Sequence, residues 1–426
     1  MSEEKRLISI DQAALNEIAR KHAMFRTARL GGARASLARH DLSYLNLVGQ
    51  DFSHADFTGA VLYQADMHEA TLDYAVLFAA DLRQANMHSV SLVRADMRGA
   101  CLRGTSLVNA DMTGVDLREG SIANREGKMI TFGEAKHPSD KGGVDLSGAN
   151  LSMAKLSGAV AINGDFSDTT MRGVRIVRAN LQGAKFEGAN LEDADLSLCD
   201  LRDANLNGAV LVNATMSLAN LTDATLAGAL TNKPIGPTIK DLPMPLSDML
   251  RAHAAWLASN GKEGQRFDIT GYDLRRSAVF ARATLTLMRG VGAMLYAMDF
   301  SDAQLQSADL READLRHANF MAADMRGCDL NKAKLNNVGM QGVQLQPLVL
   351  NEGRAVATDL SGASLRYVNF SGASLRQVNF QGADLSYANL QGCDLTDADL
   401  TGATLEGARL SPSQQEMLKD IIGNGN

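Results

Sequence analysis

The chain has 426 residues, of which 45% are hydrophobic and only 5% aromatic, with a formal net charge of −7 at pH 7. Thirteen Phe, seven Tyr and one Trp are too few for the packed layers of ordinary globular domains, whereas Leu, Ala and 38 Gly suit a narrow tube. No apolar run long enough for a membrane span is present, and the first residues lack the apolar core of a signal peptide. The four Cys form no CxxC pair, so we expect a cytoplasmic protein with reduced cysteines.

The first predicted element is a helix over residues 9–27 that covers the start of a solenoid. Ser9 and Gln12 have the spacing of a capping box, and Gly31-Gly32 is a stop signal. A covering helix is expected because the first coil of a solenoid leaves an open apolar end and an unpaired strand edge. The apolar stripe of the helix is Leu15, Ile18, Ala19, His22 and Phe25.

Most of the chain then repeats every five residues, most regularly from Thr358 to Leu410. Each unit holds a small residue, one outward residue and a large apolar residue, which is the alternation of a short extended segment. A period of five fits neither a helix nor a long strand, so the chain must run straight briefly, turn and stack. The large positions run from Leu37 to Ile122 without a miss, from Leu146 to Leu226, and from Leu285 to Leu410 after an irregular start at Ile269, Leu274 and Val279; Ala161, Gly290 and Ala355 are undersized.

Tandem A(D/N)LXX units, such as Ala308-Asp309-Leu310 and Ala388-Asn389-Leu390, resemble the bacterial pentapeptide-repeat family. The resemblance implies an all-β solenoid, a right-handed quadrilateral β-helix with one coil per twenty residues. Phe166 and Phe186 are twenty residues apart, as are Phe300 and Phe320, and each pair is predicted to stack in one interior column.

Interruptions of the repeat divide the chain. Four of the seven Pro lie between residues 230 and 245, and Pro lacks the N–H group that an inter-coil ladder requires. The helix predicted after them, beginning at Leu246, repeats the sequence pattern of the first helix, which indicates an internal duplication. We expect a first unit at 1–230 with a loop at 123–143, a Pro-rich linker at 231–245, and a second unit at 246–426 with a loop at 347–357 and a C-terminal helix at 412–422.

Two sets of charged residues are candidate partner contacts. Arg83 and Arg103 are twenty residues apart, as are Arg98 and Arg118, so each pair would stack on one face. Stacked like charges are unfavourable unless acids or a ligand intervene, and nearby acids favour a self-neutralised surface over an anion site. The second set is Lys136, His137 and Asp140 in the first predicted loop.

Other polar residues have structural explanations. His68 and His88 would stack, but no third ligand continues their column, so neither a metal site nor any other cofactor is expected. His22 and His253 recur on the stripes of the two helices and are interpreted as hydrogen-bonded packing residues, as are Arg34 and Arg266. The basic segment Arg20–Arg39 contains no acid and could contact nucleic acid or anionic lipid, but it has no long polybasic run, so nucleic acid is not the expected partner.

These observations predict a non-enzymatic scaffold that presents rigid faces and loops to a protein partner. No phosphate loop, HExxH or G-x-S-x-G motif supports an enzyme. The resemblance offers an alternative, a DNA-mimicking modulator of DNA gyrase or topoisomerase, as in quinolone resistance. Residues 41–230 carry 15 basic and 24 acidic residues and residues 231–426 carry 19 and 21, a mixture that disfavours DNA mimicry. The apolar C-terminal helix leaves a homodimer open.

Overall fold

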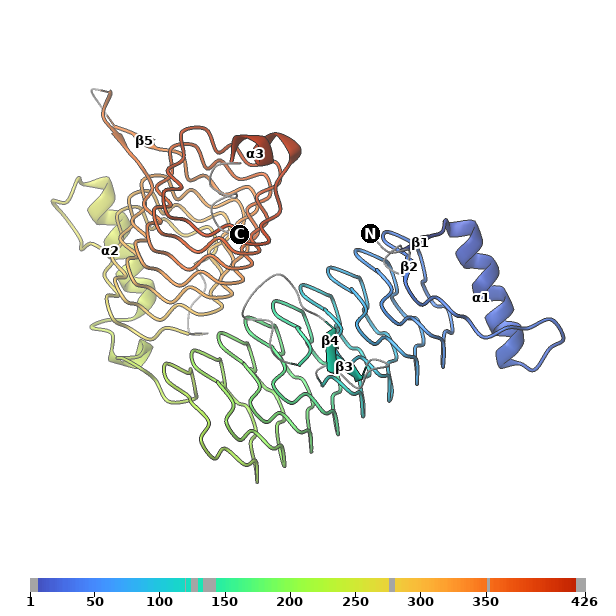
Figure 1. Ribbon diagram of the computed structural model, residues 1–426. Helices are drawn as coiled ribbons and strands as arrows, with labels where there is room; N and C mark the ends of the chain where they lie inside the picture. The colour runs from blue at the N-terminus through green and yellow to red at the C-terminus, as the bar shows by residue number, and fades with distance from the viewer. Residues whose placement is uncertain are drawn as a thin grey trace. The chain divides into compact units, whose positions relative to one another are not determined.

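The computed structural model describes residues 7–118, 120–123, 129–132, 143–275, 280–350 and 353–418. The chain forms two compact units, unit 1 at Met1–Asn232 and unit 2 at Lys233–Asn426 (Figure 1). Each unit is a stack of similar coils with a helix at its beginning.

Each coil is joined to the next by parallel bridges between residues twenty positions apart. Ser36 bridges Asp56, Asp41 bridges Val61, and Asn46 and Asp51 continue the series to Asp66 and Thr71. Four bridged segments therefore make one coil, and the tube is a four-sided parallel β-helix. The backbone bonds are regular: the Leu62 N–H donates to the Asp81 carbonyl at 2.7 Å, and the Asp81 N–H donates to the Ala60 carbonyl at 2.9 Å.

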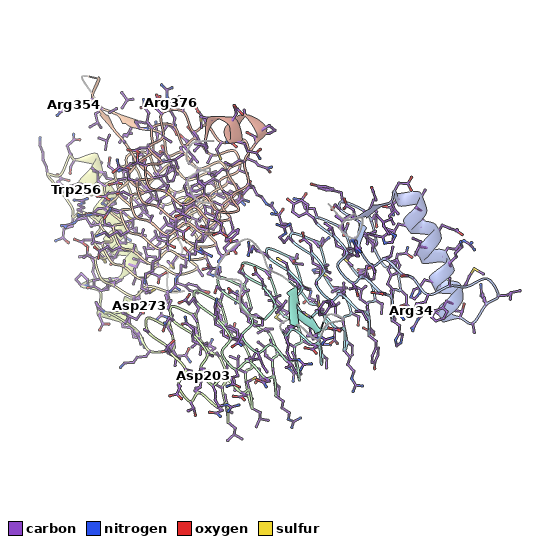
Figure 2. The ribbon with its side chains drawn as sticks, in the orientation of Figure 1. Arg34, Asp203, Trp256, Asp273, Arg354 and Arg376 are labelled. Carbon is purple, nitrogen blue, oxygen red and sulfur yellow. The ribbon has the colours of Figure 1, made fainter. Side chains whose placement is uncertain are left out.

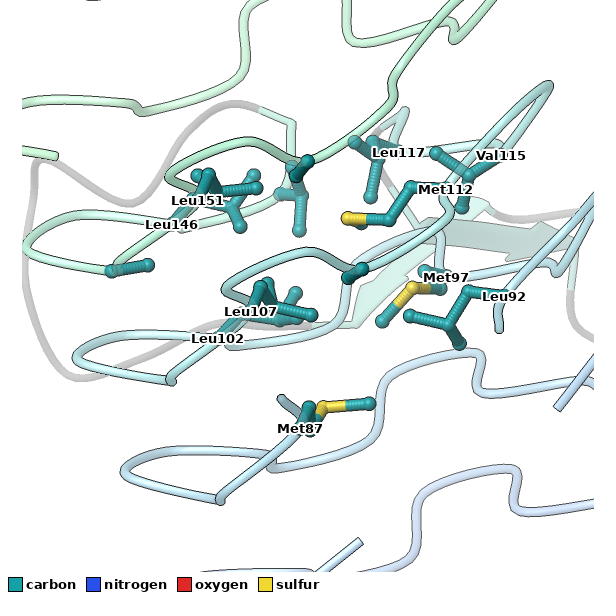
Figure 3. Close-up of a cluster of buried hydrophobic side chains, with 14 of the residues drawn as sticks. Met87, Leu92, Met97, Leu102, Leu107, Met112, Val115, Leu117, Leu146 and Leu151 are labelled. Atoms are coloured by element: carbon teal, nitrogen blue, oxygen red, sulfur yellow. The ribbon is translucent and has the colours of Figure 1, made fainter. Parts of the chain in front are cut away.

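The large residues of the repeat fill the tube, where those from successive coils lie in columns (Figure 3). Leu102, Leu107 and Leu146 are fully buried, and burying a side chain of this size contributes about 2 kcal/mol. The two predicted aromatic stacks are confirmed: the ring centroids of Phe166 and Phe186 lie 4.9 Å apart, and those of Phe300 and Phe320 lie 4.8 Å apart.

Helix α1 (Gln12–Arg26) lies at the beginning of unit 1 (Figure 1). Its N-cap is Asp11, which accepts from the Ala14 N–H, so the predicted Ser9–Gln12 capping box is wrong. Ser9 belongs instead to strand β1 (Ile8–Ser9), which pairs in parallel with β2 (His40–Asp41) on the first coil. Gln12 pairs with the same coil, because its side chain both donates to and accepts from the Asn46 backbone at 2.8 Å.

The repeat of unit 1 is interrupted after Leu117. Strands β3 (Gly120–Ala123) and β4 (Met129–Phe132) form an antiparallel hairpin, and Ile122 pairs with Ile130 within it. The prediction that Ile122 is the last large residue of the first array is therefore wrong. The parallel bridges continue on the other side of the insertion, since Cys101 bridges Asp145 and Asp116 bridges Val160.

Unit 2 begins with residues that pair with its own first coil. Thr238 bridges Asp273, the 3-10 helix η2 (Ile239–Asp241) follows, and helix α2 (Leu246–Ala258) comes next. The Pro-rich segment therefore contributes a rung to the ladder of unit 2. No helix among the described residues is long and apolar enough to cross a membrane.

The first full coil of unit 2 contains one extra residue. Asp268 bridges Arg289 and Asp273 bridges Met294, a spacing of 21 residues in both cases. Phe280 is one of the interior residues of this coil; it is fully buried and stacks on Phe300 at 5.2 Å. The predicted large position at Val279 lies outside the described residues.

The second interruption is also a hairpin, formed by β5 (Leu348–Val349) and β6 (Ala355–Val356). Ala355 is exposed in β6, so its assignment to an undersized interior position is wrong. Helix α3 (Pro412–Met417) follows the last coil, and both halves of its Ser411–Gln414 capping box are present. The predicted continuation of this helix beyond residue 418 lies outside the described residues.

Candidate interaction surface

The corners of the coils carry the side chains that point to solvent. After each large inward residue, two residues make the turn, and the second has a left-handed backbone, as at Tyr44 (φ 64°) and Gln64 (φ 53°). This conformation favours Gly, Asn and Asp, which explains the Gly that recurs in the repeat. Turn residues twenty apart lie one coil apart, so each corner is a column of outward side chains.

Arginine at the first turn position is held by an aspartate two residues earlier. Arg83 donates from Nε and Nη2 to the two carboxylate oxygens of Asp81 at 2.8 and 2.6 Å. The hydrogen bond to Asp96 raises the pKa of Arg98, and the hydrogen bond from Arg311 lowers the pKa of Asp309. The same two-residue clamp holds Arg83, Arg98, Arg118, Arg202, Arg275, Arg311, Arg316 and Arg326.

The four predicted arginines lie on two corners and are paired with acids. Arg103 reaches across the insertion to Asp145, with Nε to Oδ2 at 3.0 Å. Arg98 is clamped by Asp96 and also lies 3.8 Å from Asp116, which itself clamps Arg118. Because of these pairs, each of the two corners carries positive and negative groups side by side. The predicted loop residues Lys136, His137 and Asp140 lie outside the described residues.

Sequence reasoning missed two tyrosines on the corner of Arg83 and Arg103. Tyr44 is 69% exposed, and its ring meets that of Tyr63 edge-on at 5.7 Å. The Arg83 guanidinium lies over the Tyr63 ring, 5.8 Å from its centroid. The spacing of twenty between Tyr63 and Arg83 could have identified this column. We call Tyr44, Tyr63, Gln64, Arg83, Gln84 and Arg103 the tyrosine–arginine corner.

Hydrogen bonds fix this corner before any partner binds. Tyr63 Oη donates to Gln84 Oε1 at 3.1 Å, and Gln64 Nε2 donates to the same oxygen at 2.6 Å. A fixed aromatic and guanidinium surface loses little side-chain entropy on binding, and Tyr and Arg are enriched among residues that dominate protein interfaces.

The histidines of the two long helices are packing residues. His22 Nδ1 accepts from the Ala35 N–H at 3.0 Å, and its Nε2 lies 3.1 Å from the Ser53 carbonyl. His253 Nδ1 accepts from the Phe267 N–H at 3.0 Å. Arg34 and Arg266 donate to coil carbonyls, those of His54 and Leu287; Figure 2 shows Arg34 at the junction of α1 and the first coil.

His68 Nδ1 is paired with Asp66 at 2.9 Å. Among the residues described, no group of three or more His, Cys, Asp or Glu side chains could hold a metal ion. In the basic segment, Glu17 pairs with Arg20 and Lys21, and Asp51 pairs with Arg26. These acids lie outside the segment in sequence and offset part of its positive charge.

Comparison with known proteins identifies the repeat. A family model described as pentapeptide repeats (8 copies) matches residues 35–73, 70–107, 80–119, 142–176, 175–198, 199–229, 299–337, 350–382 and 379–411. No curated protein matches the chain.

Three solved structures of repeat proteins are similar to this chain. HetL from the cyanobacterium Nostoc sp. strain PCC 7120, a protein involved in heterocyst differentiation regulation, is 19% identical over 91% of this chain and 93% of its own, with a TM-score of 0.21. QnrB1, a plasmid-mediated fluoroquinolone resistance protein, is 16% identical over 91% and 100%, with a TM-score of 0.21. Rfr23 from the cyanobacterium Cyanothece 51142 is 30% identical over 30% and 88%, with a TM-score of 0.11.

Proposed function

The chain belongs to the pentapeptide-repeat family, and from this membership we propose that it is a non-enzymatic scaffold that binds a protein partner along the outside of its β-helices. The tyrosine–arginine corner of unit 1 is the proposed contact. The observation that carries the proposal is the exposed Tyr44 ring packed on Tyr63, beside a guanidinium held in place by Asp81.

The chemistry of this corner suits a protein partner better than a nucleic acid. Aromatic faces and a bipolar Arg–Asp clamp can meet apolar and polar groups of a protein surface. A DNA mimic needs a continuous acidic surface. In this protein, each aspartate of an Arg–Asp clamp has a positively charged guanidinium beside it. The DNA-mimicking alternative therefore remains an outcome of the test.

The contact is tested by affinity capture from a bacterial lysate on the immobilised full chain. A Tyr44→Ala/Tyr63→Ala variant should lose the captured partner. Tyr74→Ala is the matched control, because Tyr74 is also an exposed corner tyrosine, 46% exposed and stacked on His54 at 5.1 Å. Equal capture by wild type and by the double variant would contradict the proposed contact.

Two further arms separate the alternatives. Deletion of Lys136 to Gly142 tests the contribution of the first insertion, whose residues stay predicted contacts. Capture of a gyrase or topoisomerase subunit, insensitive to the tyrosine substitutions, would favour the DNA-mimicking function. A homodimer through the C-terminal helix also remains a prediction; Met417 in α3 is 55% exposed.

A further inference from the structure

The loop between α1 and the first coil, residues 27–33, holds a leucine in full contact with solvent. Leu30 is 100% exposed, and the loop that carries it projects beyond the end of α1 (Figure 1). Phe25, in the last turn of α1, is also 45% exposed. This loop lies at the first coil of unit 1, whereas unit 2 follows the last coil along the chain. We call residues 27–33 the leucine loop.

The backbone of the leucine loop is fixed against α1. The Gly32 N–H donates to the Arg29 carbonyl at 3.1 Å, which closes a β-turn with Leu30 and Gly31 at its centre. Gly31 has a φ of 83°, a conformation that favours glycine. Gly32 lies so close to α1 that any side chain there would collide with the Phe25 backbone. The two glycines therefore allow a tight turn that holds Leu30 away from the core.

The end of unit 1 that carries this loop is basic in an otherwise acidic chain. Residues 7–39 contain six basic and two acidic residues, a net charge of +4, whereas residues 40–426 contain 34 basic and 45 acidic residues, a net charge of −11. Arg29, next to Leu30, makes no ion pair within the described part of the chain. An exposed apolar side chain among cationic ones suits an anionic lipid surface, because the first can enter the headgroup boundary while the others attract the lipid charge.

The corresponding loop of unit 2 is an internal reference. It docks on its helix in the same way, since the Gln265 N–H donates to the Ala252 carbonyl at 3.2 Å, as the Ala33 N–H donates to the Lys21 carbonyl at 3.1 Å. Its tip, residues 261–264, consists of two glycines, one lysine and one glutamate and contains no apolar side chain.

The charges of the two caps differ in the same sense. From the start of the helix to the end of the loop, residues 12–34 contain five basic and one acidic residue, a net charge of +4. The equivalent residues 246–266 contain three basic and two acidic residues, a net charge of +1. The cap of a unit therefore requires neither an exposed leucine nor a large excess of positive charge, and unit 1 combines both.

We propose that the leucine loop docks unit 1 on the surface of an anionic lipid bilayer. Leu30 enters the boundary between headgroups and acyl chains, and Arg29 meets the lipid phosphates beside it. A nucleic acid would attract the same positive charge, but its phosphate backbone offers no apolar environment to a fully exposed leucine. This lipid contact is separate from the proposed protein contact, which lies at the tyrosine–arginine corner.

Co-sedimentation of the full-length chain with lipid vesicles tests the proposal. The wild type should bind vesicles of phosphatidylcholine that contain about 30% phosphatidylserine, and should bind pure phosphatidylcholine vesicles far more weakly. Leu30→Ser removes the apolar group without a change of charge and should weaken binding to the anionic vesicles roughly tenfold. Arg29→Glu should weaken it by roughly fivefold or more.

Lys262→Glu is the matched control, because it makes the same change of charge in the equivalent loop of unit 2 and should leave binding unchanged. Leu30, Arg29 and Lys262 are all exposed, and unchanged circular-dichroism spectra would establish that the variants are folded. Leu30→Trp gives a direct readout of insertion. Its emission should shift to shorter wavelength with anionic vesicles, whereas that of Trp256, the one tryptophan of the wild type, should not.

Four outcomes would overturn the proposal. They are a wild type that does not bind the phosphatidylserine vesicles, equal binding by wild type and Leu30→Ser, and equal losses in Lys262→Glu and Arg29→Glu. The fourth is binding of a DNA duplex in preference to the vesicles that is insensitive to Leu30→Ser, which would identify the basic end of unit 1 as a nucleic-acid contact.

Discussion

At the scale of single residues, the same Asp-Leu-Arg motif occurs in two environments. At the surface, the Asp81 and Arg83 side chains are 23% and 49% exposed. In the first coil of unit 2, those of Asp273 and Arg275 are 4% and 10% exposed, and Asp273 also accepts from the Ile235 N–H at 3.1 Å. Solvent screens the first pair, whereas removing one partner of the second leaves a charge uncompensated in a buried site.

Asp273→Asn should therefore destabilise unit 2 by about 3 kcal/mol, while Asp81→Asn should cost unit 1 less than about 1 kcal/mol. Urea unfolding of the two variants, followed by circular dichroism, measures both changes. Similar losses for the two substitutions would contradict the argument from burial.

His22 predicts a dependence of stability on pH. Burial lowers its pKa below the usual value near 6.5, with Ser53, Asp51, Arg26 and Arg34 as the other groups that act on it. The folded state therefore holds the ring neutral, which keeps Nδ1 free to accept from Ala35. Since the unfolded chain takes up the proton first, this stabilisation is fully present above about pH 6.5 and is lost as the pH falls through the folded pKa.

The wild type should consequently melt a few degrees lower at pH 5.5 than at pH 7.5, and His22→Gln should reduce that difference. Gln can accept from Ala35 and donate toward Ser53 without titrating. Differential scanning calorimetry at the two pH values measures the effect, and an unchanged difference in the variant would show that other groups cause it.

At the scale of elements, short polar contacts close the coil ends. Gln12 supplies a side-chain amide where the first coil lacks a neighbouring strand, and Gln414 does the same for the last coil of unit 2. Leu15 and Ala19 of α1 join the core of unit 1, and Leu418, which directly follows α3, joins that of unit 2, so each closure combines burial with hydrogen bonding to the ladder.

Gln414→Ala should destabilise the last coil of unit 2 by about 1–3 kcal/mol, because it leaves two carbonyls without their donor. Hydrogen exchange should accelerate at residues 395–410. Gln415→Ala is the matched control, since Gln415 makes one 3.4 Å contact with the Leu410 carbonyl. Equal exchange in both variants would mean that α3 closes the coil through burial alone.

At the scale of the whole molecule, each unit is a linear array in which a coil contacts its neighbours. Stability should therefore depend on the position of a substitution along the stack. Leu196 is fully buried between coils, whereas Leu221 belongs to the last coil of unit 1 and is partly exposed.

Leu196→Ala should cost unit 1 about 2–5 kcal/mol, and Leu221→Ala should cost less than half as much, because Leu221 is already partly exposed. Urea unfolding of the two variants compares the losses. Equal losses would contradict the dependence on position along the stack.

The arrays and their interior columns were predictable because a five-residue period leaves few ways to bury one large side chain per unit. The hairpins were not, since Ile122 and Ala355 kept the period of five while their pairing had changed to local antiparallel bridges. The extra residue before Phe280 was missed because neighbouring Val279 fitted the pattern equally well in sequence. The tyrosine–arginine corner depends on columns of outward residues, which the interior repeat does not reveal. The right-handed sense stays an implication of the family.

The two hairpins leave the ladder around them in register. Cys101 bridges Asp145, so 24 residues beyond the usual twenty are inserted between these two coils; Asp329 bridges Asp359, with ten extra residues. The interior columns continue across both sites as if the chain were contiguous. Such corners can take up extra chain without disturbing the interior columns, so a binding peptide could be grafted there without redesigning the core.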